Sequence, residues 1–289
     1  MQKSKLALGT VQFGLDYGIN NHRGKISLAE VFDILTAASA AGIDTLDTAR
    51  AYGESESVLG RYFFQNGCNF KLVSKFDGVD PEAVAEVVTR SLFDIGSNYF
   101  YGYLIHDFES YRRSPGIWDR LKDLKAAGKI KKIGFSLYRQ EELDYLEAKQ
   151  LKIDILQVPY SVLDQRFERH FERLHKAGIE IHTRSVFLQG LLFKAPEDLG
   201  GHFYKIRDKI KRLHEFAKAH GVSIAALCLN YSLLNGSVDK VIVGVDCLQH
   251  LQELLGVQAS MSFVKGWREE LSVLSEVDEN IILPCNWRQ

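Results

Sequence analysis

Eight short apolar runs alternate with amphipathic segments along most of the chain, and this alternation constrains the fold more than any other feature. The apolar runs, each interpreted as a strand, lie at residues 5–10, 44–48, 71–76, 101–106, 130–137, 153–161, 179–186 and 240–245. The segments with helical spacing of apolar residues include 28–41, 81–94, 117–127, 141–149 and 166–177. Strict alternation of strands and helices predicts a parallel sheet with right-handed crossovers. Eight such units within 289 residues favour a closed (β/α)8 TIM barrel over an open sheet.

The chain carries no Pro/Gly/Ser-rich linker and no break in composition, so residues 1–289 are expected to form a single domain. Strands should occupy about residues 5–245, with helices and a tail in 246–289. The tail region includes a predicted helix at 264–276. The longest irregular insertion is expected at 188–204, directly after the seventh strand.

Short signals mark where several of the predicted helices begin and end. Three helices are expected to end in Ala-Gly, at Gly42, Gly128 and Gly178. A glycine just past a helix end adopts the left-handed conformation at little steric cost and turns the chain. Ser27, with Glu30 three residues later, predicts an N-cap for the first long helix.

The charge balance gives no reason to expect a polyanionic partner. The formal net charge is −1 and no basic stripe stands out, so neither nucleic acid nor a membrane surface is an expected partner. No apolar stretch approaches the ~18 residues needed to span a bilayer. Cys68, Cys228, Cys247 and Cys285 lack metal-ligand spacing, which predicts no metal site and favours a reducing compartment. A cytoplasmic location is therefore expected.

Polar side chains stand at the predicted carboxyl ends of three consecutive strands, the end at which barrel enzymes carry their chemistry. Asp47, Lys75 and His106 end the second, third and fourth strands, and Tyr52 lies in the loop after the second. Neighbouring strands are ~4.8 Å apart, so all four side chains can reach one point. Taken singly, Asp47 could cap a turn, and Tyr52 or His106 could be a core side chain. A lysine inside an apolar strand needs a partner, and Asp47 is the obvious one for Lys75.

Such a group of residues can move a proton. The pKa of a free tyrosine is ~10, and a neighbouring ammonium such as that of Lys75 is expected to lower it. Tyr52 would then act as general acid toward a developing alkoxide, while His106 donates a hydrogen bond to the same oxygen. The set contains no nucleophile with its own base, and its chemistry is the transfer of a proton. The hydride that reduces a carbonyl carbon must therefore come from a cofactor.

In this order the residues resemble the aldo-keto reductase superfamily. The matching segments are Leu-Gly-Thr at 8–10, Asp-Thr-Ala-x-x-Tyr-Gly at 47–53, Ser-Lys at 74–75, Leu-Ile-His at 104–106, Ile-Gly-Phe-Ser at 133–136, Gln-Val-x-Tyr at 157–160 and Arg-Ser-x-x-Leu-Gln-Gly-Leu-Leu at 184–192. The resemblance, over about residues 5–260, implies a TIM-like barrel that uses NADPH. It also implies that Asp47, Tyr52, Lys75 and His106 form the catalytic tetrad, with Tyr52 as the proton donor.

The same resemblance implies a set of cofactor-binding residues. Ser136 and Gln157 would hold the nicotinamide carboxamide, and Arg184 would lie against the nicotinamide face. The remaining implied residues are Ser185, Leu188 and Gln189 around the pyrophosphate, and Gly244, Asp246, His250 and Glu253 around the adenosine.

Three positions depart from the family pattern. Arg184 replaces an aromatic residue, Leu137 stands where asparagine is frequent, and Asp246 occupies a position near the ribose that is commonly basic. A carboxylate at Asp246 would repel a 2′-phosphate and could accept from a ribose hydroxyl, so NAD(H) is possible. NADP(H) is nevertheless favoured, because nearby basic groups could compensate. These groups are His250, Lys205 and Arg207.

The leading hypothesis is an oxidoreductase that reduces an aldehyde, a ketone or a sugar-like carbonyl. The departures at the cofactor site keep a second hypothesis open, a nicotinamide-binding sensor or regulatory protein with weak or no turnover. A third, a lyase or isomerase that uses Lys75 as a Schiff-base amine, is disfavoured because Asp47 would keep that amine protonated.

The substrate is expected to be a small molecule with a carbonyl or alcohol group. Four aromatic residues are predicted to line its pocket: Phe13, Tyr17, Phe76 and Phe108. Residues 12–18 are similar to a stretch in reductases associated with bacterial surface-sugar pathways, which favours a sugar derivative. No sequence feature predicts an oligomeric state.

Overall fold

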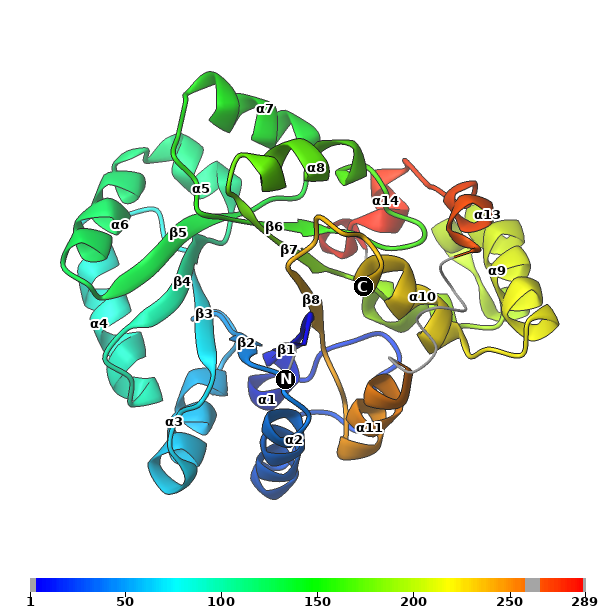
Figure 1. The fold of residues 1–289 in the computed structure, drawn as a ribbon, viewed down its shortest axis with the longest axis horizontal. Helices are drawn as coiled ribbons and strands as arrows, with labels where there is room; N and C mark the ends of the chain where they lie inside the picture. The colour runs from blue at the N-terminus through cyan, green and yellow to red at the C-terminus, as the bar shows by residue number, and fades with distance from the viewer. Residues whose placement is uncertain (1–3, 258–265, 288–289) are drawn as a thin grey trace.

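The computed structural model describes residues 4–257 and 266–287, and it places eight parallel strands in a closed barrel (Figure 1). Each strand pairs with the next along the chain, and β1 pairs with β8 to close the ring. The strands are β1 (Leu6–Gly9), β2 (Thr45–Asp47), β3 (Lys71–Phe76), β4 (Phe100–Ile105), β5 (Ile130–Ser136), β6 (Ile155–Pro159), β7 (Glu180–Arg184) and β8 (Lys240–Val243). The predicted (β/α)8 barrel is thus confirmed.

Helices surround the ring of strands, and several of them gather on one side of the barrel after β7 and β8 (Figure 1). The α-helices are α1 (Val11–Gly14), α2 (Leu28–Ala40), α3 (Ser55–Asn66), α4 (Ala83–Ile95), α5 (Phe108–Arg113), α6 (Gly116–Ala126), α7 (Gln140–Ala148), α8 (Glu168–Lys176), α9 (Arg207–Ala219), α10 (Ile224–Leu233), α11 (Leu248–Val257), α13 (Arg268–Ser272) and α14 (Glu279–Ile282). The 3-10 helices are η1 (Leu188–Phe193), η2 (Pro196–Asp198), η3 (Gly201–Ile206) and η5 (Pro284–Asn286).

The helix ends follow the sequence signals. Gly42, Gly128 and Gly178 have φ angles of 78°, 76° and 84°, the left-handed conformation expected of a glycine that ends a helix. The Ser27 side chain accepts from the backbone N–H of Glu30, as predicted for the N-cap of α2.

Two expectations for the later part of the chain need correction. The insertion predicted to be irregular at 188–204 is built from the short helices η1, η2 and η3, whose tight turns carry no long apolar pattern. Of the helix predicted at 264–276, residues 264 and 265 lie outside the described residues. In the remainder only α13 is helical, because the chain turns again after Ser272.

The barrel interior is polar at both ends, around Lys75 and around Glu180, and apolar between them. Val73, Leu104 and Ile155 form a small buried cluster that is separate from the main core. Because side chains two apart on a strand point to the same side, Val73 and Lys75 of β3 both face the interior. The apolar cluster therefore lies beneath Lys75 and separates the carboxyl end of the barrel from its other end.

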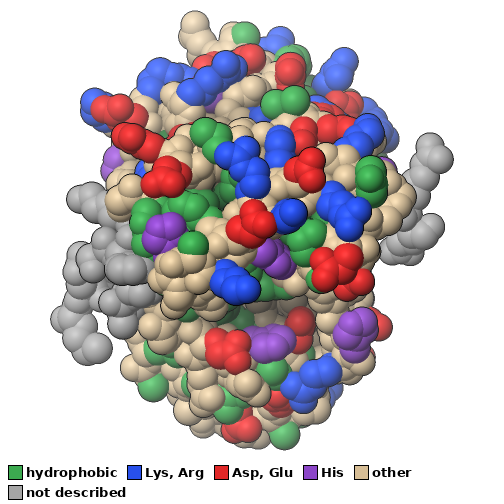
Figure 2. Space-filling model, turned by 90° about the vertical axis from the view of Figure 1, so that its right-hand side faces the viewer, with side chains coloured by type: hydrophobic (Ala, Val, Ile, Leu, Met, Phe, Trp, Pro, Cys, Tyr) green, Lys and Arg blue, Asp and Glu red, His purple; other side chains and the backbone are tan. Residues whose placement is uncertain are grey.

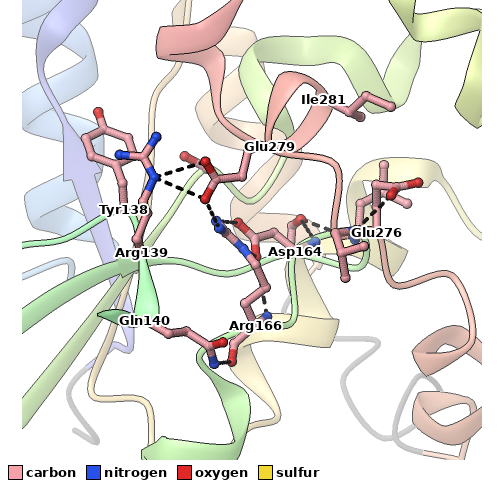
Figure 3. Close-up of polar contacts among 12 residues, drawn as sticks. Tyr138, Arg139, Gln140, Asp164, Arg166, Glu276, Glu279 and Ile281 are labelled. Atoms are coloured by element: carbon pink, nitrogen blue, oxygen red, sulfur yellow. Dashed lines mark hydrogen bonds and ion pairs between the residues drawn. The ribbon is translucent and has the colours of Figure 1, made fainter. Parts of the chain in front are cut away.

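A network of ion pairs holds the C-terminal segment against the loops that follow β5 and β6 (Figure 3). Glu279 of α14 accepts from Arg139 Nε at 2.9 Å and from Arg166 Nη1 at 3.3 Å. Arg166 also pairs with the buried carboxylate of Asp164 at 2.8 Å. The segment that ends at Trp287 thus borders the carboxyl end of the barrel.

Acidic and basic side chains are interspersed on the face drawn in Figure 2, as the near-neutral net charge implies. Among the described residues, no helix combines the length and the apolar character that crossing a bilayer requires.

Candidate functional site

A cavity of about 460 Å³ opens at the carboxyl end of the barrel. Its walls come from residues that end or follow most of the strands, together with the loop between α1 and α2 and with α11. Eleven of the residues predicted for the site line it: Asp47, Tyr52, His106, Gln157, Arg184, Ser185, Gln189, Gly244, Asp246, His250 and Glu253. The other three predicted residues, Lys75, Ser136 and Leu188, are buried behind this wall.

Lys75 is the centre of a buried polar group. Its Nζ donates to Asp47 Oδ1 at 2.6 Å, to the carbonyl oxygen of Thr48 at 2.9 Å and to Tyr52 Oη at 3.3 Å. An ammonium has three N–H donors, so each one has an acceptor. The Lys75 side chain is only 1% exposed, and the predicted pairing with Asp47 is present. This geometry fixes the charge of Lys75 next to the Tyr52 hydroxyl.

The loop that carries Tyr52 is held by close backbone contact with α1. A Cβ atom at Gly14 would lie 1.8 Å from the carbonyl oxygen of Tyr52, so only glycine fits there. Gly53, directly after Tyr52, has a φ angle of +57° and also lies against Gly14. The Tyr52 ring meets the His106 ring edge to face, with 6.0 Å between their centroids. The catalytic candidates of β2, β3 and β4 therefore converge at one point.

The pKa of Tyr52 corrects one expectation from the sequence. Burial raises this pKa above that of a free tyrosine, and the opposing charge of Lys75 reduces the rise without reversing it. Burial also lowers the pKa of Lys75, but Asp47 and Tyr52 together bring it above its ordinary value. The pair is therefore an ammonium beside a protonated phenol. That is the state a proton donor requires.

His106 is neutral in this environment. Burial lowers its pKa to about 3, and the charges of Lys75 and Arg184 add to the effect. A neutral imidazole keeps one N–H, which can donate to an oxygen held at Tyr52.

The lowered pKa of His106 also affects stability. Between pH 6.5 and 3 an unfolded chain binds a proton at this residue that the folded chain does not, so stability should fall as the pH drops. Between pH 7 and pH 5, the free energy of unfolding should fall by about 2 kcal/mol more in the unchanged protein than in His106→Gln. Urea unfolding of both proteins at the two pH values measures it. If the free energy of unfolding fell by the same amount in both proteins, His106 would not be a buried neutral group.

The residues predicted to hold the nicotinamide form a hydrogen-bonded chain with the tetrad. Gln157 Nε2 donates to Asp47 Oδ2 at 2.7 Å, and Gln157 Oε1 accepts from Ser136 Oγ at 3.4 Å. Asp47 thus accepts from both Lys75 and Gln157. Gln12 also lines the cavity, and its buried Oε1 accepts no hydrogen bond from any residue that the structure describes. An unpartnered acceptor in a cavity wall is costly, and it suits a ligand that donates.

The loop after β7 has the backbone strain often found at ligand sites. Ser185, Leu188 and Gln189 have φ angles of 64°, 46° and 53°, which non-glycine residues rarely adopt. Side chains from the loop between α1 and α2 meet this loop. Gln189 Nε2 donates to Tyr17 Oη at 2.8 Å, and Asn20 Nδ2 donates to the carbonyl oxygen of Gly190 at 2.6 Å. Two segments far apart in sequence therefore meet at the cavity wall.

Acidic side chains characterise the end of the cavity formed after β8. Asp246 accepts from Gln12 Nε2 at 3.3 Å and lies 3.8 Å from His250 Nδ1, and Glu253 follows on α11. Of the three basic groups expected to compensate for Asp246, His250 lines the cavity, whereas Lys205 and Arg207 do not. Lys205 pairs with Asp278 at 2.9 Å.

Three of the four aromatic residues predicted to line the pocket do not. Phe13, Phe76 and Phe108 are buried in the main hydrophobic core, and only Tyr17 lines the cavity. For Phe76 the reason is strand alternation, because Lys75 faces the interior and its neighbour must face the helices. The lining residues that the sequence did not assign to the site include Gln12, Asn20, Asn21, Tyr138, Phe187 and Phe193. Of these, Gln12 lies within the stretch 12–18 that the sequence singled out.

Comparison with known proteins agrees with this geometry. The model of the Aldo/keto reductase family matches residues 5–265. Aldo-keto reductase str7 of Strobilurus tenacellus is 27% identical over 286 residues, which cover 88% of this chain and 83% of that protein. The NADH-specific methylglyoxal reductase of Escherichia coli (strain K12) is 27% identical over 220 residues, 65% of each chain.

A solved structure shares the fold at low sequence identity. The aldo-keto reductase AKR11C1 from Bacillus halodurans, in its holo form, aligns with a TM-score of 0.79 and 19% identity. The alignment covers 96% of this chain and 95% of that one. Together with the family match over most of the sequence, the comparison shows that the chain belongs to the aldo/keto reductase family and is an NAD(P)-dependent oxidoreductase.

Proposed function

We propose that this protein reduces the carbonyl group of a small aldehyde, ketone or sugar derivative, with Tyr52 as the proton donor. The observation that carries the proposal is the Lys75 ammonium, held 2.6 Å from Asp47 Oδ1 and 3.3 Å from Tyr52 Oη at the cavity. Three features support a nucleotide site in the same cavity: the Ser136–Gln157 pair, the strained loop after β7, and Gln12 Oε1, to which no described residue donates. A nicotinamide nucleotide bound there supplies the hydride.

The side chains around Tyr52 suit a substrate oxygen that becomes negative. Tyr52 Oη and the imidazole N–H of His106 would both donate to the carbonyl oxygen and so stabilise developing charge. Tyr52 then passes its proton to that oxygen. The phenolate that remains is stabilised by Lys75 until a proton returns from solvent. Asp47 holds Lys75 in the required position throughout.

A carbonyl panel tests the proposed reaction. The purified protein, given NADH or NADPH, should consume the reduced nucleotide when supplied with short aldehydes, methylglyoxal and aldose sugars. Oxidation should depend on the carbonyl compound and yield the alcohol in equal amount. Tight nucleotide binding without turnover on any compound would instead favour the sensor hypothesis, for which the departures at Arg184, Leu137 and Asp246 are the motivation.

The charges of the cavity favour NAD(H) over the NADP(H) that the sequence favoured. Asp246 and Glu253 line the end formed after β8, whereas Lys205 and Arg207 do not line the cavity. A carboxylate close to a 2′-phosphate repels it, and His250 is the one basic side chain among the described residues that line that end. The family relative from Escherichia coli, named as NADH-specific, is consistent with this choice.

Neutralising Asp246 should shift this preference. We expect Asp246→Asn to increase the affinity for NADPH relative to NADH by about tenfold, because one repulsive charge is lost. Fluorescence titration with each nucleotide measures the ratio of the two Kd values. Glu197→Gln removes an exposed carboxylate outside the cavity and serves as the control. A ratio that does not change in Asp246→Asn would place the 2′ position of the ribose away from this carboxylate.

A further inference from the structure

Arg184, the last residue of β7, places a partly buried guanidinium in the cavity wall, where no carboxylate among the described residues pairs with it. Its Nη2 donates to the carbonyl oxygen of Leu137 at 3.0 Å, and its Nη1 donates to Ser185 Oγ at 3.3 Å. The guanidinium also lies 4.0 Å from the centre of the Tyr138 ring. These three contacts orient the guanidinium but leave its charge uncompensated, because each partner is neutral.

Two nearby arginines show the contrast (Figure 3). Arg139, next to Tyr138 in the chain, pairs with Glu279 at 2.9 Å, and Arg166 pairs with Asp164 at 2.8 Å. Throughout residues 4–257 and 266–287, no Asp or Glu forms an ion pair with Arg184. A partly buried charge without a partner is costly, which indicates a ligand or a reaction that uses it.

One carboxylate lies close enough to respond to Arg184. Burial raises the pKa of Glu142, and the charge of Arg184 is among the groups that oppose the rise. Glu142 Oε2, however, accepts from the backbone N–H groups of Tyr138 at 2.7 Å and of Arg139 at 3.1 Å. Glu142 therefore caps the start of α7 and forms no ion pair with the guanidinium.

The charge of Arg184 reaches the catalytic centre. After burial, it is one of the groups that shift the pKa of Tyr52, His106 and Tyr17, in each case toward lower values. Lys75 is already balanced by Asp47 at 2.6 Å. The reacting end of the cavity thus carries a net charge of about +1, contributed by Arg184.

We propose that Arg184 makes this site bind reduced nicotinamide nucleotide more tightly than the oxidised form. The inference rests on the proposed function, since it requires the nicotinamide ring to lie near Tyr52. The two redox forms differ in one charge, because the oxidised ring is cationic and the reduced ring is neutral. Their phosphates are the same, so attraction between Arg184 and the phosphates cancels when the two affinities are compared.

The expected size of the effect follows from Coulomb's law. Two unit charges roughly 5 Å apart, in surroundings of intermediate polarity, change a binding constant by about tenfold to a hundredfold. After hydride transfer, a nucleotide bound there would be in its oxidised, cationic form, which Arg184 would repel, and Tyr52 would give its proton to the carbonyl oxygen. The same repulsion that weakens binding of the oxidised nucleotide should therefore speed its release after turnover.

The test compares Kd values for NADH and NAD⁺, and for NADPH and NADP⁺, by calorimetry in the absence of substrate. We expect Arg184→Gln to lower the ratio of oxidised to reduced Kd by about tenfold or more. Arg184→Lys keeps the charge and should keep most of the ratio. Arg139→Gln removes a neighbouring arginine that Glu279 already neutralises, so it should leave the ratio unchanged. Arg184→Met, checked by thermal unfolding, repeats the charge removal with an apolar chain.

The outcomes separate the possible roles of Arg184. Equal weakening of both redox forms in Arg184→Gln and Arg184→Met would mean that the guanidinium contacts a phosphate, and the inference would be wrong. An unchanged ratio would likewise overturn it. A protein that binds no nicotinamide nucleotide in either form would refute the proposed function itself, together with the inference.

Discussion

Tyr52→Phe is expected to lower kcat/KM for carbonyl reduction by about 10²- to 10⁴-fold, with little change in Kd for the nucleotide. The phenol hydroxyl lies 3.3 Å from Lys75 Nζ and, in our proposal, acts mainly in the transition state. Its removal should therefore affect the chemical step far more than binding. Steady-state kinetics on the best substrate of the panel, with fluorescence titration of the nucleotide, measure both quantities.

Tyr138→Phe is the matched control for this change. Tyr138 also lines the cavity, and its ring contacts Arg184, but none of the three N–H donors of Lys75 points to its hydroxyl. We expect its kcat/KM to stay within a few-fold of the unchanged protein. A Tyr52→Phe protein with full activity would assign proton donation to another group.

Asp47→Ala is expected to destabilise the folded chain by about 3–5 kcal/mol, because it leaves the Lys75 ammonium buried without its counter-charge. Lys75 is 1% exposed, so water cannot replace the lost carboxylate without rearrangement. Gln157 Nε2 loses its acceptor at the same time. Urea unfolding at neutral pH, followed by circular dichroism, gives the free energy of unfolding.

The double variant Asp47→Ala/Lys75→Met separates charge burial from the loss of packing. Removal of the ammonium as well should recover much of the lost stability, while activity stays absent because Tyr52 has no cation beside it. If Asp47→Ala alone were as stable as the unchanged protein, the ion pair would not be buried as the structure has it.

Much of the fold follows from the sequence because the barrel repeats one simple pattern. Each strand is a short apolar run, each helix has one apolar face, and glycines such as Gly42 and Gly128 adopt the conformation that turns the chain between them. The convergence of Asp47, Lys75 and His106 follows as well, because parallel strands bring their carboxyl ends to one side. Strand position alone therefore indicates where these side chains meet.

Other features depend on contacts between segments far apart in the chain. The hydrogen bonds from Gln189 to Tyr17 and from Asn20 to Gly190 join the loop after β7 to the loop between α1 and α2. No local sequence pattern predicts these contacts. The pKa of Tyr52 depends on its burial as well as on the charge of Lys75. A prediction from the charge alone therefore has the wrong direction for the shift of this pKa. The prediction that Phe76 lines the pocket rests on its position near a strand end. The side of β3 on which its side chain lies decides its environment instead.

A crystal structure of the protein with NAD⁺ tests most directly the claim that hydride transfer takes place beside Tyr52. The account predicts the nicotinamide ring next to Tyr52, so that a carbonyl held by its hydroxyl lies about 3–3.5 Å from the ring carbon that carries the hydride. It also predicts Lys75 Nζ between Asp47 and Tyr52. A nucleotide bound outside this cavity, or a ring directed away from Tyr52, would contradict it.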